Sequence, residues 1–229
     1  MASNDEYGIA LIDNEIDARL CAKLLAEEFA LYNPLAAFIQ ITAKEFFAQR
    51  TYPLMLDVLD EKLSFLIRHR PTNEVAAAII ANDLFSYYEK RRFETFNPIS
   101  NYPTKDLFTE MLDKFVHVDF DQELKPNTVL FLLSGATRFT HAGNNLAAQL
   151  RAHVCNHARN TRGFQYAFIQ TCHPATRHIY IKKMNGKESR VVDPAEWVWK
   201  KKDAGLSRPF KDYKDEPVVN ILIDLNEQK

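Results

Sequence analysis

The stretch TVLFLLSGATRFTHAGNNL, residues 128–146, is the part of this sequence that decides the fold. An apolar run over residues 128–133 passes through small residues into a polar turn, and a helical pattern begins at Leu146. A strand that leads through a turn into a helix directs unpaired backbone N–H groups, and the positive end of the helix dipole, toward one point. This arrangement favours a phosphate-binding site, although an ordinary β-α-β unit that binds nothing has the same pattern.

The segment after the turn has the period of an amphipathic helix. Apolar residues recur at every fourth position from Leu146 to Val154. Asn144 or Asn145 is expected to cap the start of this helix, and Gly163 to end it. A second apolar run follows directly, so strand, turn, helix and strand are predicted in succession.

Cap and turn signals predict most of the other elements. These are a strand at residues 7–12, a helix after Asn14, a helical stretch from Thr42 that is interrupted near Pro53 and resumes over 54–63, a hairpin of residues 64–68 and 75–81, and strands in part of 190–199 and over 217–225. Segment 84–126 is longer than a hairpin connection requires and is rich in aromatic residues, with a helix plausible over 104–117. Most of these aromatics are expected to pack against the sheet, and a few to line a substrate pocket.

Two motifs in this chain resemble the GNAT superfamily of acyl-CoA-dependent N-acetyltransferases. The turn of that superfamily reads Gln/Arg-x-x-Gly-x-Gly/Ala with Leu three residues later. Arg138, Gly143 and Leu146 match that pattern, while His141 stands where the first Gly belongs.

The second motif of the superfamily, Asn-x-x-Ala-x-x-x-Tyr-x-Lys, follows its fifth strand. Here Tyr180 and Lys182 match, whereas His173 and Thr176 depart from it. The order of elements is also similar to that of the superfamily, near its arylalkylamine and dopamine N-acetyltransferase-like branch.

The resemblance implies an α/β GNAT fold. Its sheet is mixed and mostly antiparallel, with six to seven strands, helices on both faces and splayed central strands four and five. The chain would form a single N-acetyltransferase domain, residues 1–229, with an elaborated segment at 84–126.

The resemblance also implies an activity: transfer of an acetyl group from acetyl-CoA to a primary amine, by direct attack in a ternary complex. A small-molecule amine is favoured over a protein lysine or N-terminus. Tyr180 is expected to protonate the departing thiolate. The positions expected to bind coenzyme A are Leu133, Ser134, Arg138, Phe139, Thr140, His141, Ala142, Gly143, Asn144 and His173.

The general base is not predicted by the motif. The arylalkylamine branch has a Glu-Pro pair after the first helix, where this chain has Asn33-Pro34, and an asparagine cannot accept a proton at neutral pH. Glu28, Asp83 or water remain as candidates. Two other functions are also open: a non-catalytic acyl-CoA-binding module for sensing or assembly, and an α/β interaction domain without either activity.

Composition narrows the class of partners. The chain has 29 basic and 30 acidic side chains among 229 residues, a balance that gives no indication of nucleic-acid binding. Three cysteines and no long apolar run predict a cytoplasmic protein with reduced thiols and no membrane partner. His153 and His157 are four residues apart but have no evident third ligand, so no metal is expected. The oligomeric state is left open.

Overall fold

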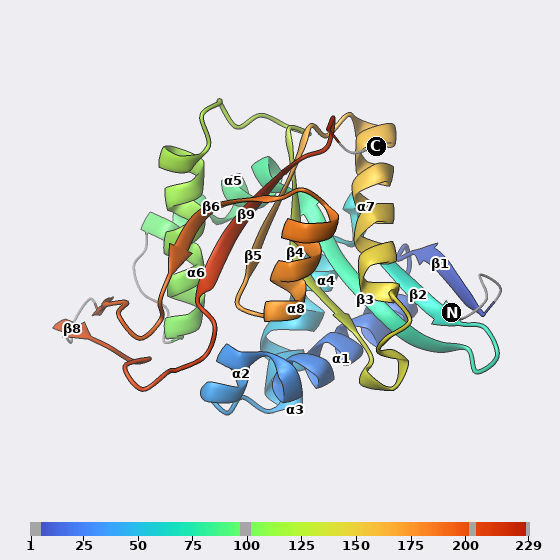
Figure 1. The fold of residues 1–229 in the computed structure, drawn as a ribbon, viewed down its shortest axis with the longest axis horizontal. Coiled ribbons are helices and arrows are strands. Elements are labelled where there is room, and N and C mark those ends of the chain that lie inside the picture. The colour runs from blue at the N-terminus through green and yellow to red at the C-terminus, as the bar shows by residue number, and fades with distance from the viewer. Residues whose placement is uncertain (1–5, 97–101, 202–204, 228–229) are drawn as a thin grey trace. The chain divides into compact units, whose positions relative to one another are not determined.

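A computed structural model of the chain describes residues 6–96, 102–201 and 205–227 (Figure 1). Contacts divide the chain into two compact units, each made of two segments. The first unit comprises residues 1–82 and 130–164, and the second comprises residues 83–129 and 165–229. The main sheet has seven strands, in the order β1-β2-β3-β4 in the first unit and β5-β9-β6 in the second.

The first unit is built on four strands and two long helices. Its strands are β1 (Tyr7–Leu11), β2 (Phe65–His69), β3 (Glu74–Asp83) and β4 (Val129–Thr137). Its helices are α1 (Glu15–Tyr32), α2 (Pro34–Phe38), α3 (Ala43–Phe46), α4 (Tyr52–Asp57) and α7 (Leu146–Arg162), with the short turns η1 (Phe47–Thr51), η2 (Leu59–Glu61) and η4 (Phe139–His141). The β1–β2 and β2–β3 pairs are antiparallel.

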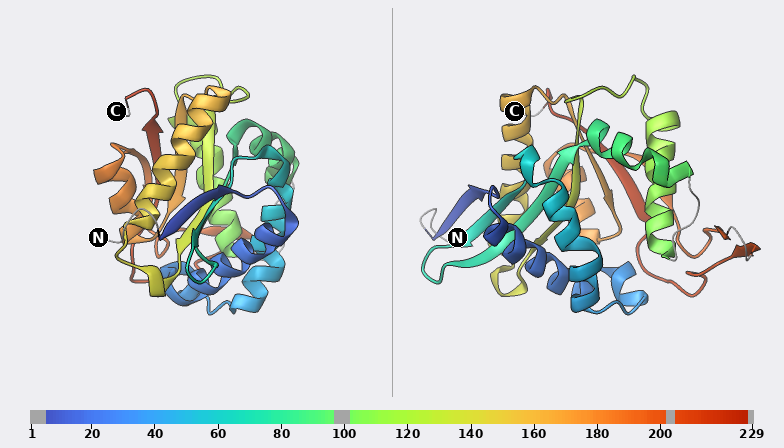
Figure 2. Two further views of the ribbon diagram at one scale, coloured as in Figure 1. Left: turned by 90° about the vertical axis from the view of Figure 1, so that its right-hand side faces the viewer. Right: turned by 180° about the vertical axis from the view of Figure 1, so that it is seen from behind.

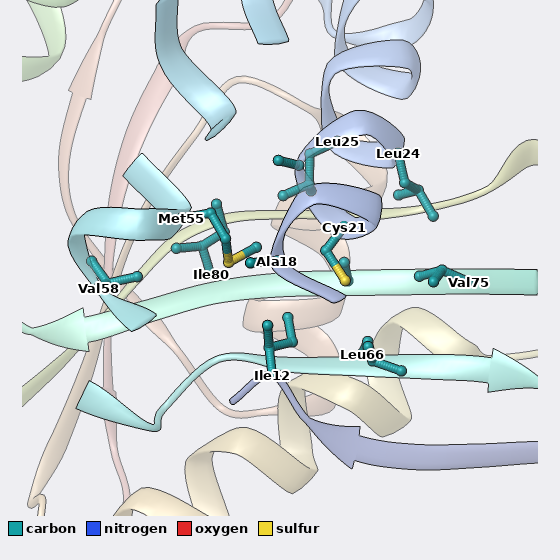
Figure 3. Close-up of a cluster of buried hydrophobic side chains, with 12 residues drawn as sticks. Ile12, Ala18, Cys21, Leu24, Leu25, Met55, Val58, Leu66, Val75 and Ile80 are labelled. Carbon is teal, nitrogen blue, oxygen red and sulfur yellow. The ribbon is translucent and has the colours of Figure 1, made fainter. Parts of the chain in front are cut away.

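Side chains from β2 show how the helices of this unit are layered. Leu66 belongs to the buried cluster that contains Leu25 of α1 and Met55 of α4 (Figure 3). Its neighbour Phe65 instead contacts the rings of His153 and His157 on α7. Because adjacent residues of a strand face opposite sides of a sheet, α1 and α7 cover opposite faces, as Figure 2 shows.

The second unit combines three strands with a helical layer. Its strands are β5 (Tyr166–Thr171), β9 (Val218–Asp224) and β6 (Lys187–Val192), with both pairs antiparallel. Its helices are α5 (Leu84–Phe96), α6 (Pro103–Lys114) and α8 (Pro174–His178), followed by the π-helical turns η3 (Phe115–Asp119) and η5 (Ile179–Lys183). Strands β7 (Trp199–Lys201) and β8 (Gly205–Ser207) form a separate ribbon.

Part of the aromatic segment packs as core in this unit. The Phe115 ring stacks on Phe168 of β5 at a centroid distance of 3.9 Å and also contacts Phe120. The Asn220 side chain, fully buried on β9, donates to the Met111 carbonyl of α6 at 2.9 Å. These contacts confirm the packing interpretation for Phe115 and Phe120, while residues 97–101 of the segment lie outside the described part.

The predicted fold class is confirmed: the chain is a mixed α/β protein with a mostly antiparallel seven-stranded sheet. The splay of strands four and five and the single-domain organisation stay predictions. The strand predicted in part of residues 190–199 corresponds to β6, which begins earlier, at Lys187, while Trp199 lies in the separate β7. In the described residues no helix is long and apolar enough to cross a membrane.

Candidate functional site

The predicted phosphate turn lies between β4 and α7 in the first unit, and its first residue is anchored to β3. The Arg138 N–H, one residue past the end of β4, donates to the Ala76 carbonyl of β3 at 2.8 Å. Gly143 has a φ of 84°, a conformation that side chains with a Cβ rarely adopt. Helix α7 then begins after Asn145, whose side chain makes no capping hydrogen bond.

Arg138 forms ion pairs with carboxylates of two other elements. Its Nε lies 2.8 Å from Glu74 Oε1 on β3, and its Nη1 lies 3.3 Å from Glu27 Oε2 on α1. One guanidinium charge therefore faces two carboxylates. The cation predicted to bind the cofactor is neutralised by the protein itself.

His141 is held on the inner side of the turn. Its Nδ1 lies 3.0 Å from the Tyr7 hydroxyl of β1, and its Nε2 lies 3.3 Å from Glu74 Oε2. The Asn144 side-chain amide donates to the same tyrosine hydroxyl at 3.2 Å. Only 12% of the His141 side chain is exposed, and its two ring nitrogens connect the turn to β1 and β3.

An amide of the turn already binds an anionic group. The backbone N–H of Phe139 donates to Glu28 Oε1 of α1 at 3.3 Å. Burial raises the pKa of the Glu28 carboxyl above its ordinary value, while the Phe139 N–H and the Arg138 charge act in the opposite direction. A carboxylate and a phosphate are both oxyanions. Glu28 therefore accepts a hydrogen bond from a backbone N–H that was expected to face the cofactor.

A pocket of about 510 Å³ opens at this turn, and all of its lining belongs to the first unit. Its walls carry two carboxylates, one guanidinium, two imidazoles, two threonine hydroxyls, one phenol and one phenyl ring, from Glu28, Glu74, Arg138, His69, His141, Thr72, Thr140, Tyr32 and Phe139. Phe139, 65% exposed, stacks on Tyr32 at 5.2 Å between ring centroids. The pocket lining therefore combines a stacked aromatic pair with two carboxylates.

The remaining predicted positions are distributed over both units. Leu133 of β4 packs against the core of the first unit, and Ser134 follows it on the strand. His173 and Tyr180 belong to the second unit, where His173 precedes α8 and Tyr180 is buried within η5. The structure thus brings residues 138–144 together at one turn, and the roles of Leu133, Ser134, His173 and Tyr180 stay predictions.

The candidate bases have other contacts. Asp83 is almost fully buried, and its two oxygens accept the N–H groups of Phe85 at 3.1 Å and Asn127 at 2.9 Å. Asn33, in place of the family's Glu, caps α2 by accepting the Ala36 N–H at 3.0 Å. These side chains stabilise the local backbone.

The histidine pair on α7 packs against an aromatic ring. The rings of His153 and His157 both contact Phe65 edge-on, at centroid distances of 4.9 and 4.8 Å. Burial lowers the pKa of His153, with a smaller contribution from His157. Within the described ranges no group of three or more His, Cys, Asp or Glu side chains is placed to hold a metal ion.

Comparison with solved structures shows the fold. The chain is similar to the polyamine N-acetyltransferase of Drosophila melanogaster (TM-score 0.71, 12% identity, covering 95% of this chain and 99% of that one). It is also similar to arylalkylamine N-acetyltransferase 2 of Aedes aegypti (TM-score 0.69, 14% identity, 96% and 99% covered). The chain has the GNAT fold. No family model and no curated protein sequence matches it.

A third similar structure is named for condensation and not for N-acetylation. It is the C-terminal condensation domain of Ebony in complex with beta-alanyl-dopamine, with a TM-score of 0.63, 14% identity, and 96% of this chain and 98% of that chain covered. The GNAT neighbours therefore include both N-acetyltransferases and a condensation domain.

Several residues of this GNAT turn had no signal in the sequence. Tyr7, Glu27 and Glu74 reach it from β1, α1 and β3, and Glu28 was weighed as a base and not as a neighbour of the turn. Glu28 and Phe139 are 111 residues apart in the chain, so only the tertiary structure shows their contact.

Proposed function

We propose that this chain is an N-acyltransferase that moves an acetyl group from a thioester, acetyl-CoA in the first instance, to the primary amine of a small molecule. The observation that carries the proposal is the GNAT fold together with the strand, turn and helix at residues 129–162. The neighbours named for amines, the polyamine and arylalkylamine N-acetyltransferases, support a small-molecule acceptor.

In the proposed reaction the neutral amine nitrogen attacks the thioester carbonyl in a ternary complex. A C–N bond forms, the C–S bond breaks, the nitrogen loses one proton, and the thiolate that leaves takes one up. We assign protonation of the thiolate to Tyr180, because a phenolic hydroxyl is a suitable donor to sulfur. We assign the amine proton to water, because backbone N–H groups already bind the carboxylates of Asp83 and Glu28.

The donor is proposed to bind along the end of β4 and at the turn that follows it. Backbone groups near Leu133 and Ser134 would face the acyl carbonyl and the thioester arm. When the donor is acetyl-CoA, its diphosphate is expected to lie at the turn from Arg138 to Asn144, near the backbone N–H groups there. From the family resemblance we also assign a donor-binding role to His173 and an acceptor-binding role to the aromatic segment 84–126.

Release of free thiol tests the proposal. The protein is incubated with acetyl-CoA and a panel of amines that includes an arylalkylamine, agmatine and a polyamine, and the thiol is measured over time. We expect release that depends on both protein and amine. Coenzyme A binding without turnover on any amine would instead favour the non-catalytic binding module, and the absence of both would favour an interaction domain.

A further inference from the structure

The turn at residues 138–144 has an unusual electrostatic environment for a diphosphate site. Three carboxylates surround it, from Glu27, Glu28 and Glu74, and the one guanidinium is shared between two of them. A diphosphate approaching the turn would meet like charges at close range, and like charges repel most strongly where solvent is partly excluded. The local negative charge therefore opposes binding of a diphosphate at this turn.

Glu28 also opposes diphosphate binding directly, because its carboxylate accepts the hydrogen bond that a phosphate oxygen would accept. Its carboxylate accepts the Phe139 N–H at 3.3 Å, so a phosphate oxygen has to displace it to reach this amide. Burial raises the pKa of Glu28. The other titratable groups at the turn are Glu27, Glu74, Arg138, His69, His141, Tyr7 and Tyr32.

We propose that Glu28 is a specificity-determining residue that selects against thioester donors bearing a diphosphate at this turn. The inference rests on the proposed acyltransferase function and specifies its donor class: acyl thioesters that are recognised by their acyl-pantetheine portion. Acetyl-CoA is then an adequate donor without being a preferred one. In this mechanism the Glu28 carboxylate and a phosphate compete for the Phe139 N–H, and the surrounding carboxylates repel the phosphate.

The test compares two donors that share the reacting end. Acetyl-CoA and S-acetyl-pantetheine are assayed with one amine, and the ratio of their kcat/KM values is measured for the wild type and for Glu28→Ala. We expect the wild-type ratio to lie within about threefold of one, and the variant to raise it in favour of acetyl-CoA by about tenfold. Because a ratio is measured, a change in acceptor handling or in folded fraction cancels.

Two further variants isolate the cause. Glu28→Gln removes the charge but keeps an acceptor for the Phe139 N–H, so the ratio should rise by less than it does in Glu28→Ala. Asp60→Ala removes one exposed negative charge from the same unit, away from the pocket lining, and should leave the ratio as it is in the wild type. An equal rise in the Asp60 variant would attribute the effect to net charge and overturn the assignment to Glu28.

Calorimetric binding of coenzyme A and of pantetheine separates this inference from the proposed function. Tighter coenzyme A binding by Glu28→Ala, without turnover of either donor, would support the inference while contradicting the acyltransferase proposal. A wild-type protein that prefers acetyl-CoA by 100-fold or more would overturn the inference. So would a Glu28→Ala variant, folded by its melting temperature, whose affinity for coenzyme A is unchanged or absent.

Discussion

At the scale of single residues, the turn shows how a few side chains can change the charge around a common sequence motif. His141 stands where the family pattern has glycine, yet its imidazole lies inward, against Tyr7 and Glu74. Arg138 matches the pattern, but its charge is neutralised by neighbouring carboxylates. A residue that matches a motif therefore need not retain the role that the motif implies.

Tyr180→Phe is expected to lower kcat by about 10²-fold and to leave the affinity for acetyl-CoA nearly unchanged, because the ring still fills its buried position. Steady-state kinetics and a binding titration measure the two effects. Tyr213→Phe is the matched control, since the Tyr213 hydroxyl donates to the Glu216 carbonyl at 2.9 Å. That control should lose about 1 kcal/mol of stability and keep its kcat. Equal kcat values in the Tyr180 variant and the wild type would remove Tyr180 from the mechanism.

Glu28 should also affect the pH dependence of stability. Its folded-state pKa is raised, chiefly by burial, so this carboxyl binds its proton more tightly in the folded protein than in the unfolded chain. The stability linked to this group is fully present below the ordinary value of 4.5 and is lost as pH rises through the raised pKa. Urea unfolding of the wild type and Glu28→Gln is measured from below pH 4.5 to above the raised pKa. As pH rises, the wild type should lose unfolding free energy relative to the variant. If the two proteins show the same pH dependence, the raised pKa of Glu28 is contradicted.

At the scale of elements, cap and turn residues in the sequence correctly predicted where several helices begin or end. Asn14 caps α1, Thr42 and Glu45 form the predicted capping box at the start of α3, and Gly163 ends α7. The hairpin of β2 and β3 was also predicted correctly from its turn. The π-helical turns at 47–51, 115–119 and 179–183 have no comparable local signal, and the environment of the turn depends on contacts between β1, α1, β3 and η4 that no short window of sequence contains.

Gly186→Ala tests how η5 is fixed against β9. A Cβ at this position would lie 2.7 Å from Ile221 Cγ2 and 2.9 Å from the Tyr180 carbonyl oxygen. One of these contacts is to backbone, so relief requires a shift of η5, and we expect a loss of about 1–3 kcal/mol. Chemical denaturation measures it. Gly8→Ala, where the nearest contact would be 3.4 Å from the flexible Arg70 side chain, is the control and should cost much less. Similar losses in both variants would show that the close approach at Gly186 is unimportant.

At the scale of the whole molecule, the fold was predictable from the sequence, and the surroundings of the candidate site were predictable only in part. Apolar periodicity and two motifs were sufficient for the GNAT fold, because the order of strands and helices is encoded along the chain. The position of the turn at residues 138–144 followed from the same motifs. Its carboxylate environment could not be predicted, because Glu27 and Glu74 are separated from Arg138 by 111 and 64 residues.

The most direct test of the central claim is to follow the acyl group itself. S-acetyl-pantetheine and acetyl-CoA carrying a ¹³C-labelled acetyl group are incubated separately with the protein and an arylalkylamine, and the amine is analysed by mass spectrometry. The account predicts that the protein produces the labelled N-acetyl amine from both donors, in step with release of free thiol. Labelled acetate with unmodified amine, or no product from either donor across the amine panel, would contradict it.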